Sequence, residues 1–258
     1  MSHDDMITDE IFAALSHCGT KAYLMREGVR GISSQEVSWQ QEVAREFKQS
    51  ALEWLTSKVP EDDCHRGTPS LRVLRDGRYR LLLEPIVMAS NLWTQPDALL
   101  RTRSKSDDVR PHYIPVRFEK NEKPSLANKL LLAYDALIMS RITGNTPQTG
   151  KLIHGIQFAT TTVSLPRLVA DATPSITKFM SNKLPAERPP LVLNRHCPEC
   201  EFQSRCRAAA LEKDDLSLLT NMTTKEREAE PQGYLYGHPV VLHLSAKTAP
   251  KNECVVRC

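Results

Sequence analysis

Apolar residues recur at helical spacing over residues 7–27 and again from about Ser34. Ser33 and Glu36 have the spacing of a capping box, which indicates the start of the second helix. Cys18 falls inside the first segment. The apolar positions that define the two helices are Ile11, Leu15, Ala22, Val43, Phe47, Ala51, Trp54 and Leu55.

The middle of the chain changes to short apolar runs that are typical of strands. Residues 69–75 and 79–88 flank Asp76-Gly77, a strong turn signal, and we expect a hairpin there. Gly144 ends a later helical pattern. The other expected elements are strands at 98–101, 112–118, 151–158 and 161–165, a charged loop at 104–110 and a helix at 126–142. This order predicts an α/β or α+β domain around one mixed sheet.

Composition narrows the class of protein only a little. The 258 residues are 40% hydrophobic and 25% charged with a net charge of +3, which is typical of a globular protein and does not by itself indicate a nucleic-acid binder. No apolar segment has the length of a membrane span, and the polar, acidic residues 1–9 lack a signal core. We therefore expect a cytoplasmic protein with no membrane partner, in which seven cysteines serve as thiols or metal ligands.

The clearest chemical signal is a cysteine cluster. Cys197, Cys200 and Cys206 form a C-x2-C-x5-C pattern, in which two thiolates converge from one turn and the third closes from the next. A fourth ligand has to come from elsewhere. Cys18 is the best candidate because the other cysteines, Cys64, Cys254 and Cys258, have polar surroundings.

The spacing leaves the identity of the metal open. Four thiolates suit tetrahedral zinc as well as an iron–sulfur cluster. His196, next to Cys197, is an alternative ligand to Cys18 in a Cys3His zinc site. A third alternative is a group of free thiols that are close by chance.

A distant cysteine, an intervening α/β core and the stretch Leu193–Arg207, followed by residues 212–219, form a specific combination. It resembles the iron–sulfur branch of the RecB-like nucleases in the PD-(D/E)XK superfamily, to which the CRISPR-associated iron–sulfur exonucleases belong. The resemblance covers roughly residues 7–247. It implies a PD-(D/E)XK restriction-endonuclease-like α/β core, a mixed sheet flanked by helices, with a C-terminal cysteine-cluster segment. It also implies a 4Fe–4S cluster, with zinc as the alternative, that ties the first helix to the C-terminal segment.

The resemblance further implies an organisation and partners. Residues 1–192 would form the nuclease-fold core, 193–210 the cysteine cluster closing on Cys18, and 211–258 a helical connector with a poorly structured tail. Relatives often continue into a ribonuclease-H-like region, so we expect a truncated chain with a downstream ribonuclease-H-like or helicase partner. The expected ligand is DNA or RNA.

A metal-dependent nuclease site of this superfamily needs an Asp on one strand and E-x-K on the next. The Asp falls on Asp97, for which a solvated turn residue is the alternative. The E-x-K positions hold Arg117 and Glu119, which share a strand face, so the charge order is reversed. Asp97 and Glu119 are the catalytic candidates, and together with Glu42 they are the candidate ligands for Mg²⁺ or Mn²⁺.

The altered motif leaves activity open. We favour an Arg117–Glu119 ion pair over a metal site, because charged neighbours on one strand face commonly pair. A degenerate phosphodiesterase, a catalytically inactive nucleic-acid-binding or interaction module and a zinc-stabilised domain with no nucleic-acid role are the three hypotheses.

Two further features bear on the site. Related nucleases often have a Gln four residues before a Tyr, but Leu130 precedes Tyr134 here, so only packing is expected from that helix. His154 lies in an apolar strand and is expected to be a satisfied core or rim residue. A basic patch that could contact a phosphate backbone, with a solvated loop as the alternative, consists of Arg101, Arg103, Lys105 and Arg110.

Overall fold

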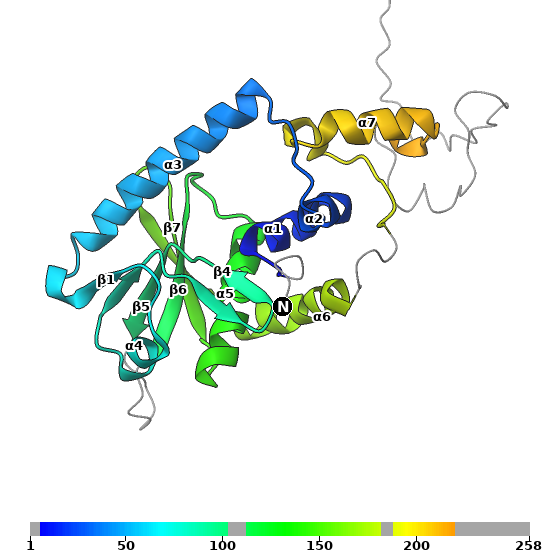
Figure 1. Ribbon diagram of the computed structural model, residues 1–258. Coiled ribbons are helices and arrows are strands. Elements are labelled where there is room, and N and C mark those ends of the chain that lie inside the picture. Colours follow the sequence, from blue (N-terminus) through cyan, green and yellow to red (C-terminus); the bar gives the residue numbers. More distant parts are fainter. Residues whose placement is uncertain (1–5, 103–111, 182–187, 220–258) are drawn as a thin grey trace, which may run out of the picture. The chain divides into compact units, whose positions relative to one another are not determined.

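A mixed six-stranded sheet organises the fold in the computed structural model, which describes residues 6–102, 112–181 and 188–219 (Figure 1). In spatial order its strands are β1 (Cys64–Arg66), β2 (Leu81–Leu83), β5 (Ala98–Thr102), β6 (His112–Glu119), β7 (Thr149–His154) and β8 (Ala159–Ser164). β1–β2 and β6–β7 pair in parallel, and the other neighbours are antiparallel. A separate antiparallel pair joins β3 (Val87–Ala89) to β4 (Leu92–Thr94).

The chain divides into two compact units. The first is Met1–Leu191 with Arg195–Gln203, and the second is Val192–Asn194 with Ser204–Cys258. The helices of the first unit are α1 (Asp9–His17), α2 (Gly19–Arg26), α3 (Gln35–Thr56), α4 (Leu71–Asp76), α5 (Leu126–Thr143) and α6 (Pro166–Ser181), with 3-10 turns η2 (Glu61–Asp63) and η3 (Cys197–Glu199). The second unit contains η4 (Leu216–Leu218) and all of α7 (Gln203–Glu212) except its first residue.

Serine caps begin three helices of the first unit. The hydroxyls of Ser34, Ser70 and Ser125 each accept a hydrogen bond from the backbone N–H three residues further on, at the starts of α3, α4 and α5.

Within the described ranges, no helix has both the length and the apolar composition that a membrane span requires.

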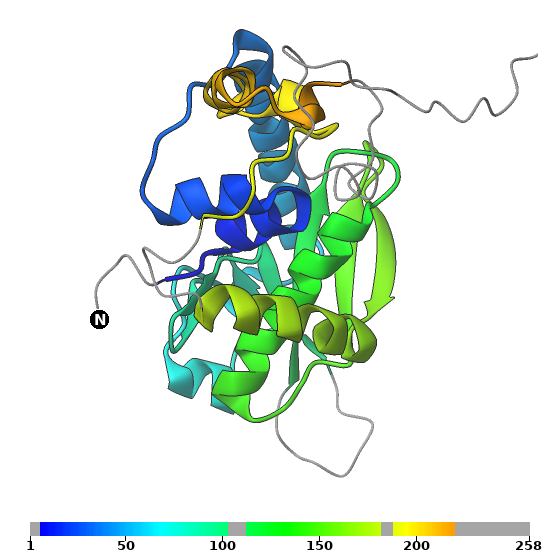
Figure 2. The same cartoon turned by 90° about the vertical axis from the view of Figure 1, so that its right-hand side faces the viewer.

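The alternation of apolar residues along the strands places one helix on each face of the sheet. Leu81 and Leu83 of β2 pack with Leu52 and Leu55 of α3, whereas Leu82 lies in the cluster with Tyr134 of α5. α3 therefore covers one face and α5 the other, as Figures 1 and 2 show. α5 is also the crossover between the parallel strands β6 and β7.

Most of the expected elements are confirmed, including a mixed sheet flanked by helices. The hairpin expected around Asp76-Gly77 is wrong. Residues 71–76 form α4, and Gly77 ends that helix in the left-handed conformation, with φ 59°. A glycine after a polar residue suits both a tight turn and a helix end, and Ser70 as N-cap favours the helix. The first expected helical segment is divided at Cys18 into α1 and α2.

Candidate functional site

Asp97 lies where β5 begins, beside the strand that carries Arg117. Ala98 pairs with Val116, so position 97 stands opposite position 117. The Asp97 side chain is 10% exposed. Its Oδ2 accepts a 2.6 Å hydrogen bond from the Phe118 N–H, and its Oδ1 lies 3.0 Å from Lys48 Nζ of α3. Asp97 is thus a buried, paired carboxylate and not a solvated turn residue.

A second carboxylate that the sequence did not single out stands next to Asp97. Glu84 follows β2, and its backbone N–H donates to the Asp97 carbonyl at 2.9 Å. Its Oε1 lies 3.5 Å from Lys48 Nζ, and its Oε2 accepts from Arg66 Nη1 at 2.7 Å. Glu84 has a φ of 47°, a left-handed conformation that costs energy for a residue with a side chain and often occurs at functional sites.

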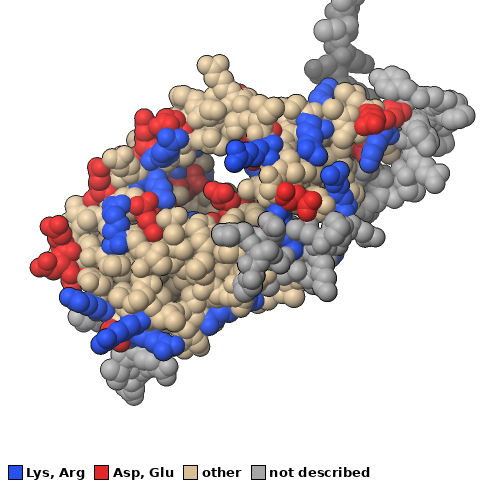
Figure 3. Space-filling model, in the orientation of Figure 1, with Lys and Arg blue, Asp and Glu red and all other residues tan. Residues whose placement is uncertain are grey.

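A pocket of about 330 Å³ opens over these charged groups. Three basic and two acidic side chains contribute to it, so its lining is close to neutral. Figure 3 shows the same mixture on the surface, where basic and acidic side chains are interspersed on the α3 side of the molecule. The residues that line the pocket are Arg45, Lys48, Gln49, Leu52, Glu53, Arg66 and Glu84.

Arg117 does not pair with Glu119, and that expectation is wrong. Its guanidinium donates to both carboxylate oxygens of Asp135 on α5, with Nε to Oδ2 at 2.9 Å and Nη2 to Oδ1 at 2.7 Å. Nη2 also donates to Asp9 Oδ2 at 2.8 Å and to Thr94 Oγ1 at 2.8 Å. The β6 strand runs beside α5, and the fully buried Asp135 carboxylate there attracts the guanidinium more strongly than the half-buried Glu119 carboxylate on its own strand.

The electrostatics of this cluster keep Arg117 charged. Burial disfavours the cation, but Asp135 and then Asp9 and Asp97 outweigh that effect and raise the pKa of Arg117 above its ordinary value. The guanidinium therefore serves as the fixed positive centre of a structural network between α1, β4, β6 and α5.

The other candidate metal ligands are engaged elsewhere. Glu119 accepts from Asn121 with one carboxylate oxygen and from Asn128 with the other, at 2.7 and 2.6 Å. Glu42 pairs with Arg45 of the same helix at 2.9 Å. Within residues 6–102, 112–181 and 188–219, no three His, Cys, Asp or Glu side chains form a group that could hold a metal ion. Asp97, Glu119 and Glu42 thus do not fit a magnesium or manganese site.

The remaining site predictions have mixed outcomes. Tyr134 does more than pack, because its hydroxyl donates to the Ile7 carbonyl at 2.6 Å and its ring stacks on Phe12. His154 is buried at the rim of the sheet, with Nε2 2.8 Å from Thr161 Oγ1. Arg101 is exposed, and its Nη1 donates to the Gly77 carbonyl. The rest of the predicted basic patch, Arg103, Lys105 and Arg110, lies outside the described residues.

Cys18, Cys197 and Cys200 belong to the first unit. Cys18 caps α2, with Sγ accepting from the Lys21 N–H at 3.4 Å. Cys197 opens η3, and its carbonyl accepts from the Cys200 N–H at 3.1 Å. Burial raises the pKa of the Cys200 thiol. Among the described residues, these cysteines do not form a group of three ligands that could hold a metal ion. Cys206 belongs to the second unit.

Contacts on both sides of the cysteines join the start of the chain to residues 196–201. The rings of His17 and His196 have centroids 4.6 Å apart. Lys21 Nζ pairs with Glu201 Oε2 at 2.9 Å, across 180 residues of sequence, and the Ile32 N–H donates to the Glu201 carbonyl at 2.8 Å. The return of the chain to its first helices, which the cysteine hypothesis requires, is present as far as Glu201.

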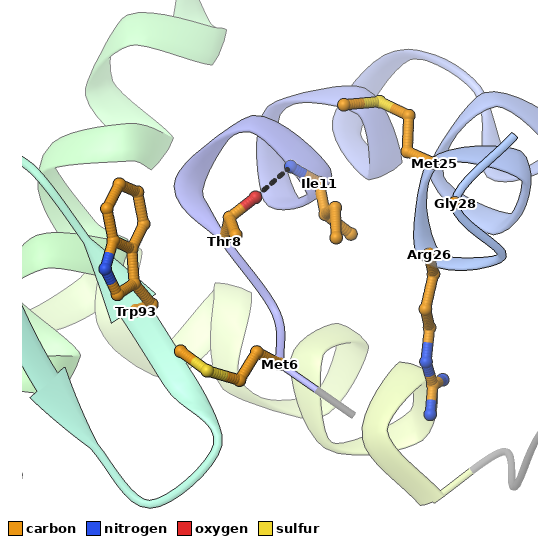
Figure 4. A pocket seen from close by; sticks show the side chains of 7 residues that line it. All are labelled: Met6, Thr8, Ile11, Met25, Arg26, Gly28 and Trp93. Carbon is orange, nitrogen blue, oxygen red and sulfur yellow. Dashed lines mark hydrogen bonds between the residues drawn. The ribbon is translucent and has the colours of Figure 1, made fainter. Parts of the chain in front are cut away.

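A second pocket, of about 350 Å³, lies beside α1 and α2 (Figure 4). Its lining is mostly apolar, with Met6, Ile11 and Trp93. The Thr8 hydroxyl is engaged as the N-cap of α1, at 3.2 Å from the Ile11 nitrogen. Arg26 extends toward α6, where Nη1 donates to the Phe179 carbonyl at 2.8 Å. Both polar side chains thus have structural roles.

Sequence inspection missed several residues that build these sites. Asp135 sits in the run Leu-Ala-Tyr-Asp-Ala-Leu-Ile, where a lone carboxylate among apolar residues indicates a buried partner. Lys48 precedes Leu52 and Leu55 by four and seven residues, so it shares the face of α3 that packs on the sheet. The sequence around Glu84 did not indicate a site residue, because its position beside Asp97 depends on the register between β2 and β5.

Comparison with known proteins adds little. No protein-family model matches the chain, and no curated protein matches it. Among solved structures, the crystal structure of SSO0001 is similar, with a TM-score of 0.41 and 15% sequence identity over 81% of this chain and 88% of that chain. A likeness this distant carries no argument about function.

Proposed function

We propose that this chain is a RecB-like nuclease-fold protein that binds DNA or RNA without hydrolysing it, and that an iron–sulfur cluster joins its two ends. The observation that carries the proposal is the register that sets Asp97, at the start of β5, opposite position 117 of β6. In PD-(D/E)XK nucleases the metal-binding Asp and the E-x-K pair occupy neighbouring strands in this way.

The order of elements around that register supports the nuclease fold. Helix α3 precedes strands β2, β5 and β6, which pair antiparallel in sequence order, and α5 then crosses to the parallel strand β7. A helix before the sheet and a buttressing helix after the motif strand are what the resemblance implies for this superfamily.

The side chains at the motif positions favour binding over catalysis. Metal-assisted hydrolysis needs carboxylate oxygens that are open to a divalent cation. Asp97 is paired with Lys48, position 117 holds a guanidinium bound to Asp135, and Glu119 is held by two asparagines. A phosphodiester at these positions would therefore meet paired charges and no open metal site.

The chemistry of the cysteines supports the cluster. Each thiolate of a 4Fe–4S centre binds its own iron atom, so the sulfurs can be farther apart than around one tetrahedral zinc ion. Lys21, three residues after Cys18, is bound to Glu201, next to Cys200, so an ion pair joins the two segments of the first unit that carry these cysteines. Cys206 would supply the fourth. When bound, the cluster would hold the segment that carries Cys197 and Cys200 on the first helices.

The cofactor is tested on protein purified without oxygen. We expect about four iron and four sulfide per chain and broad visible absorption. Cys18→Ser should lose most of the iron, whereas Cys64→Ser, a matched change in β1, should keep it. Bound zinc in place of iron, or equal iron in the two variants, would refute the cluster or its Cys18 ligand.

Nucleic-acid binding is tested by fluorescence anisotropy with labelled single-stranded DNA and RNA of one sequence. We expect binding that weakens with salt and no digestion in Mn²⁺. Arg103→Ala/Lys105→Ala should reduce the salt slope by about 1.4, because each lost phosphate contact removes about 0.7. The control Arg167→Ala/Lys178→Ala removes two charges from α6. Absence of binding, or digestion that Asp97→Asn abolishes, would contradict the proposal.

A further inference from the structure

Glu84 and Asp97 form a carboxylate pair at adjoining ends of two strands. Leu83 of β2 pairs with Ala98 of β5, so positions 84 and 97 face each other, and the Glu84 N–H donates to the Asp97 carbonyl at 2.9 Å. This backbone contact holds the two residues side by side. Two carboxylates held in this way attract a cation, and in many phosphodiesterases that cation is a divalent metal ion.

One ammonium group already stands between them. Lys48 Nζ lies 3.0 Å from Asp97 Oδ1 and 3.5 Å from Glu84 Oε1. The side chain of Lys48 is about one-third exposed, whereas that of Asp97 is 10% exposed, so the ammonium closes the solvent side of the buried carboxylate. An ammonium is a compact point charge that donates in several directions, which suits a position between two acceptors.

The packing of α3 holds Lys48 at this position. Leu52, one turn later, and Leu55 pack against Leu81, Leu83 and Ala98 on the sheet. Helical residues four apart lie on the same side, so Lys48 is directed at the strand ends where the two acids are. The position of Lys48 is therefore set by the packing of α3 on the sheet and not by surface contacts alone.

The other oxygens of the pair are also satisfied. Asp97 Oδ2 accepts from the Phe118 N–H, and Glu84 Oε2 accepts from Arg66. Arg66 is 63% exposed and can turn into solvent, but Lys48 has to leave both carboxylates before a metal ion enters.

We propose that the Lys48 ammonium is a tethered cation that fills the position between Asp97 and Glu84 and excludes a divalent metal ion from it. This inference rests on the proposed function. The Lys48 ammonium explains how a nuclease-like site becomes a binding site without a metal ion. With the Lys48 ammonium in place, the basic and acidic side chains around the pocket beside Arg45 and Arg66 balance one another without a metal ion.

Manganese binding to the full chain tests this directly. Wild type, Lys48→Met and Lys48→Met/Asp97→Asn are titrated with Mn²⁺, and bound ion is measured by electron paramagnetic resonance. We expect Lys48→Met to gain one site at least about tenfold tighter than any in the wild type, because two open carboxylates suit a hard cation. The double variant should lose that site. Lys58→Met, just beyond the end of α3, is the matched control and should bind as the wild type does.

The outcomes separate the two proposals. A Lys48→Met variant that is folded by circular dichroism but gains no site overturns the tethered cation, as does a wild type that binds Mn²⁺ as tightly as Lys48→Met does. If Lys48→Met does not fold, Lys48→Gln, which keeps most of the stem and removes the charge, takes its place. None of these titrations contains nucleic acid, so failure of the proposed function in the anisotropy assay leaves their result unaffected.

Discussion

The Arg117 guanidinium binds both carboxylate oxygens of Asp135 at 2.9 and 2.7 Å, and both side chains are buried. The pair joins β6 to α5, and Asp9 and Thr94 extend it to α1 and β4. The position that would carry a catalytic carboxylate in a nuclease thus carries a structural cation here.

Removing only one partner of this pair should be costly. Arg117→Met leaves the buried Asp135 carboxylate without its cation, and we expect the free energy of unfolding to fall by about 3–5 kcal/mol in urea titrations. Arg117→Met/Asp135→Leu should be less destabilised than either single variant, because no buried charge is left on α5. A double variant whose loss equals the sum of the two single losses would show that the groups do not act as a pair.

The elements around this network were largely predictable from the sequence. Period-2 and helical patterns identified the strands at 98–101 and 112–118 and the helix at 126–142, because burial on a sheet face and on a helix face have different periods. The same alternation placed Arg117 and Glu119 on one face. For Asp97 the sequence left a metal-binding residue and a solvated turn residue open, and its buried, paired carboxylate excludes the second.

The partners of those residues were not predictable in the same way. Lys48 reaches Asp97 through the packing of α3 on the sheet, and Glu84 reaches it through strand register, which are tertiary relationships with no local signature. Asp76-Gly77 is ambiguous for a different reason. Its glycine needs a left-handed conformation in a hairpin turn and at a helix end alike.

Gly77 offers a simple test of the helix-end assignment. Its φ of 59° is unfavourable for a residue with a Cβ, so Gly77→Ala should lower the free energy of unfolding by about 1 kcal/mol. Gly77→Asn should cost less, since asparagine tolerates this conformation better. Equal losses in the two variants would show that the backbone conformation is not the cause. Chemical denaturation of the three proteins provides the comparison.

Gly31 lies against the segment that carries two of the cysteines. A Cβ at this position would overlap Glu201 Cγ and would be 2.8 Å from the Glu201 carbonyl oxygen, which is too close for any real contact. Gly31→Ala should therefore displace Glu201 and weaken the Ile32–Glu201 hydrogen bond, at a cost of about 1–3 kcal/mol.

Hydrogen exchange of the Ile32 amide would report this displacement locally, with faster exchange expected in Gly31→Ala. Gly19→Ala is the matched control, because a Cβ there would meet Pro189 at an ordinary 3.6 Å. Unchanged protection of Ile32 in Gly31→Ala would show that the two segments are not in close contact.

Tyr113 should make the stability of the fold sensitive to alkaline pH. Burial raises the pKa of Tyr113 from 10.0 to about 12, against a smaller opposing effect of Arg101. The unfolded chain then loses this proton at lower pH than the folded chain does. The stability that the folded chain gains by keeping the Tyr113 hydroxyl protonated is fully present below pH 10. It is lost as the pH rises toward 12, which lowers the free energy of unfolding by up to about 2.7 kcal/mol.

Tyr113→Phe separates this effect from other alkaline titrations. At pH 8 the variant should be less stable by about 1 kcal/mol, because it lacks the 2.7 Å hydrogen bond to the Tyr79 carbonyl. Its stability should fall less steeply above pH 10, so that the two unfolding curves converge and then cross. Parallel pH profiles in urea titrations from pH 8 to 11.5 would mean that Tyr113 ionises in the folded chain as readily as in the unfolded one.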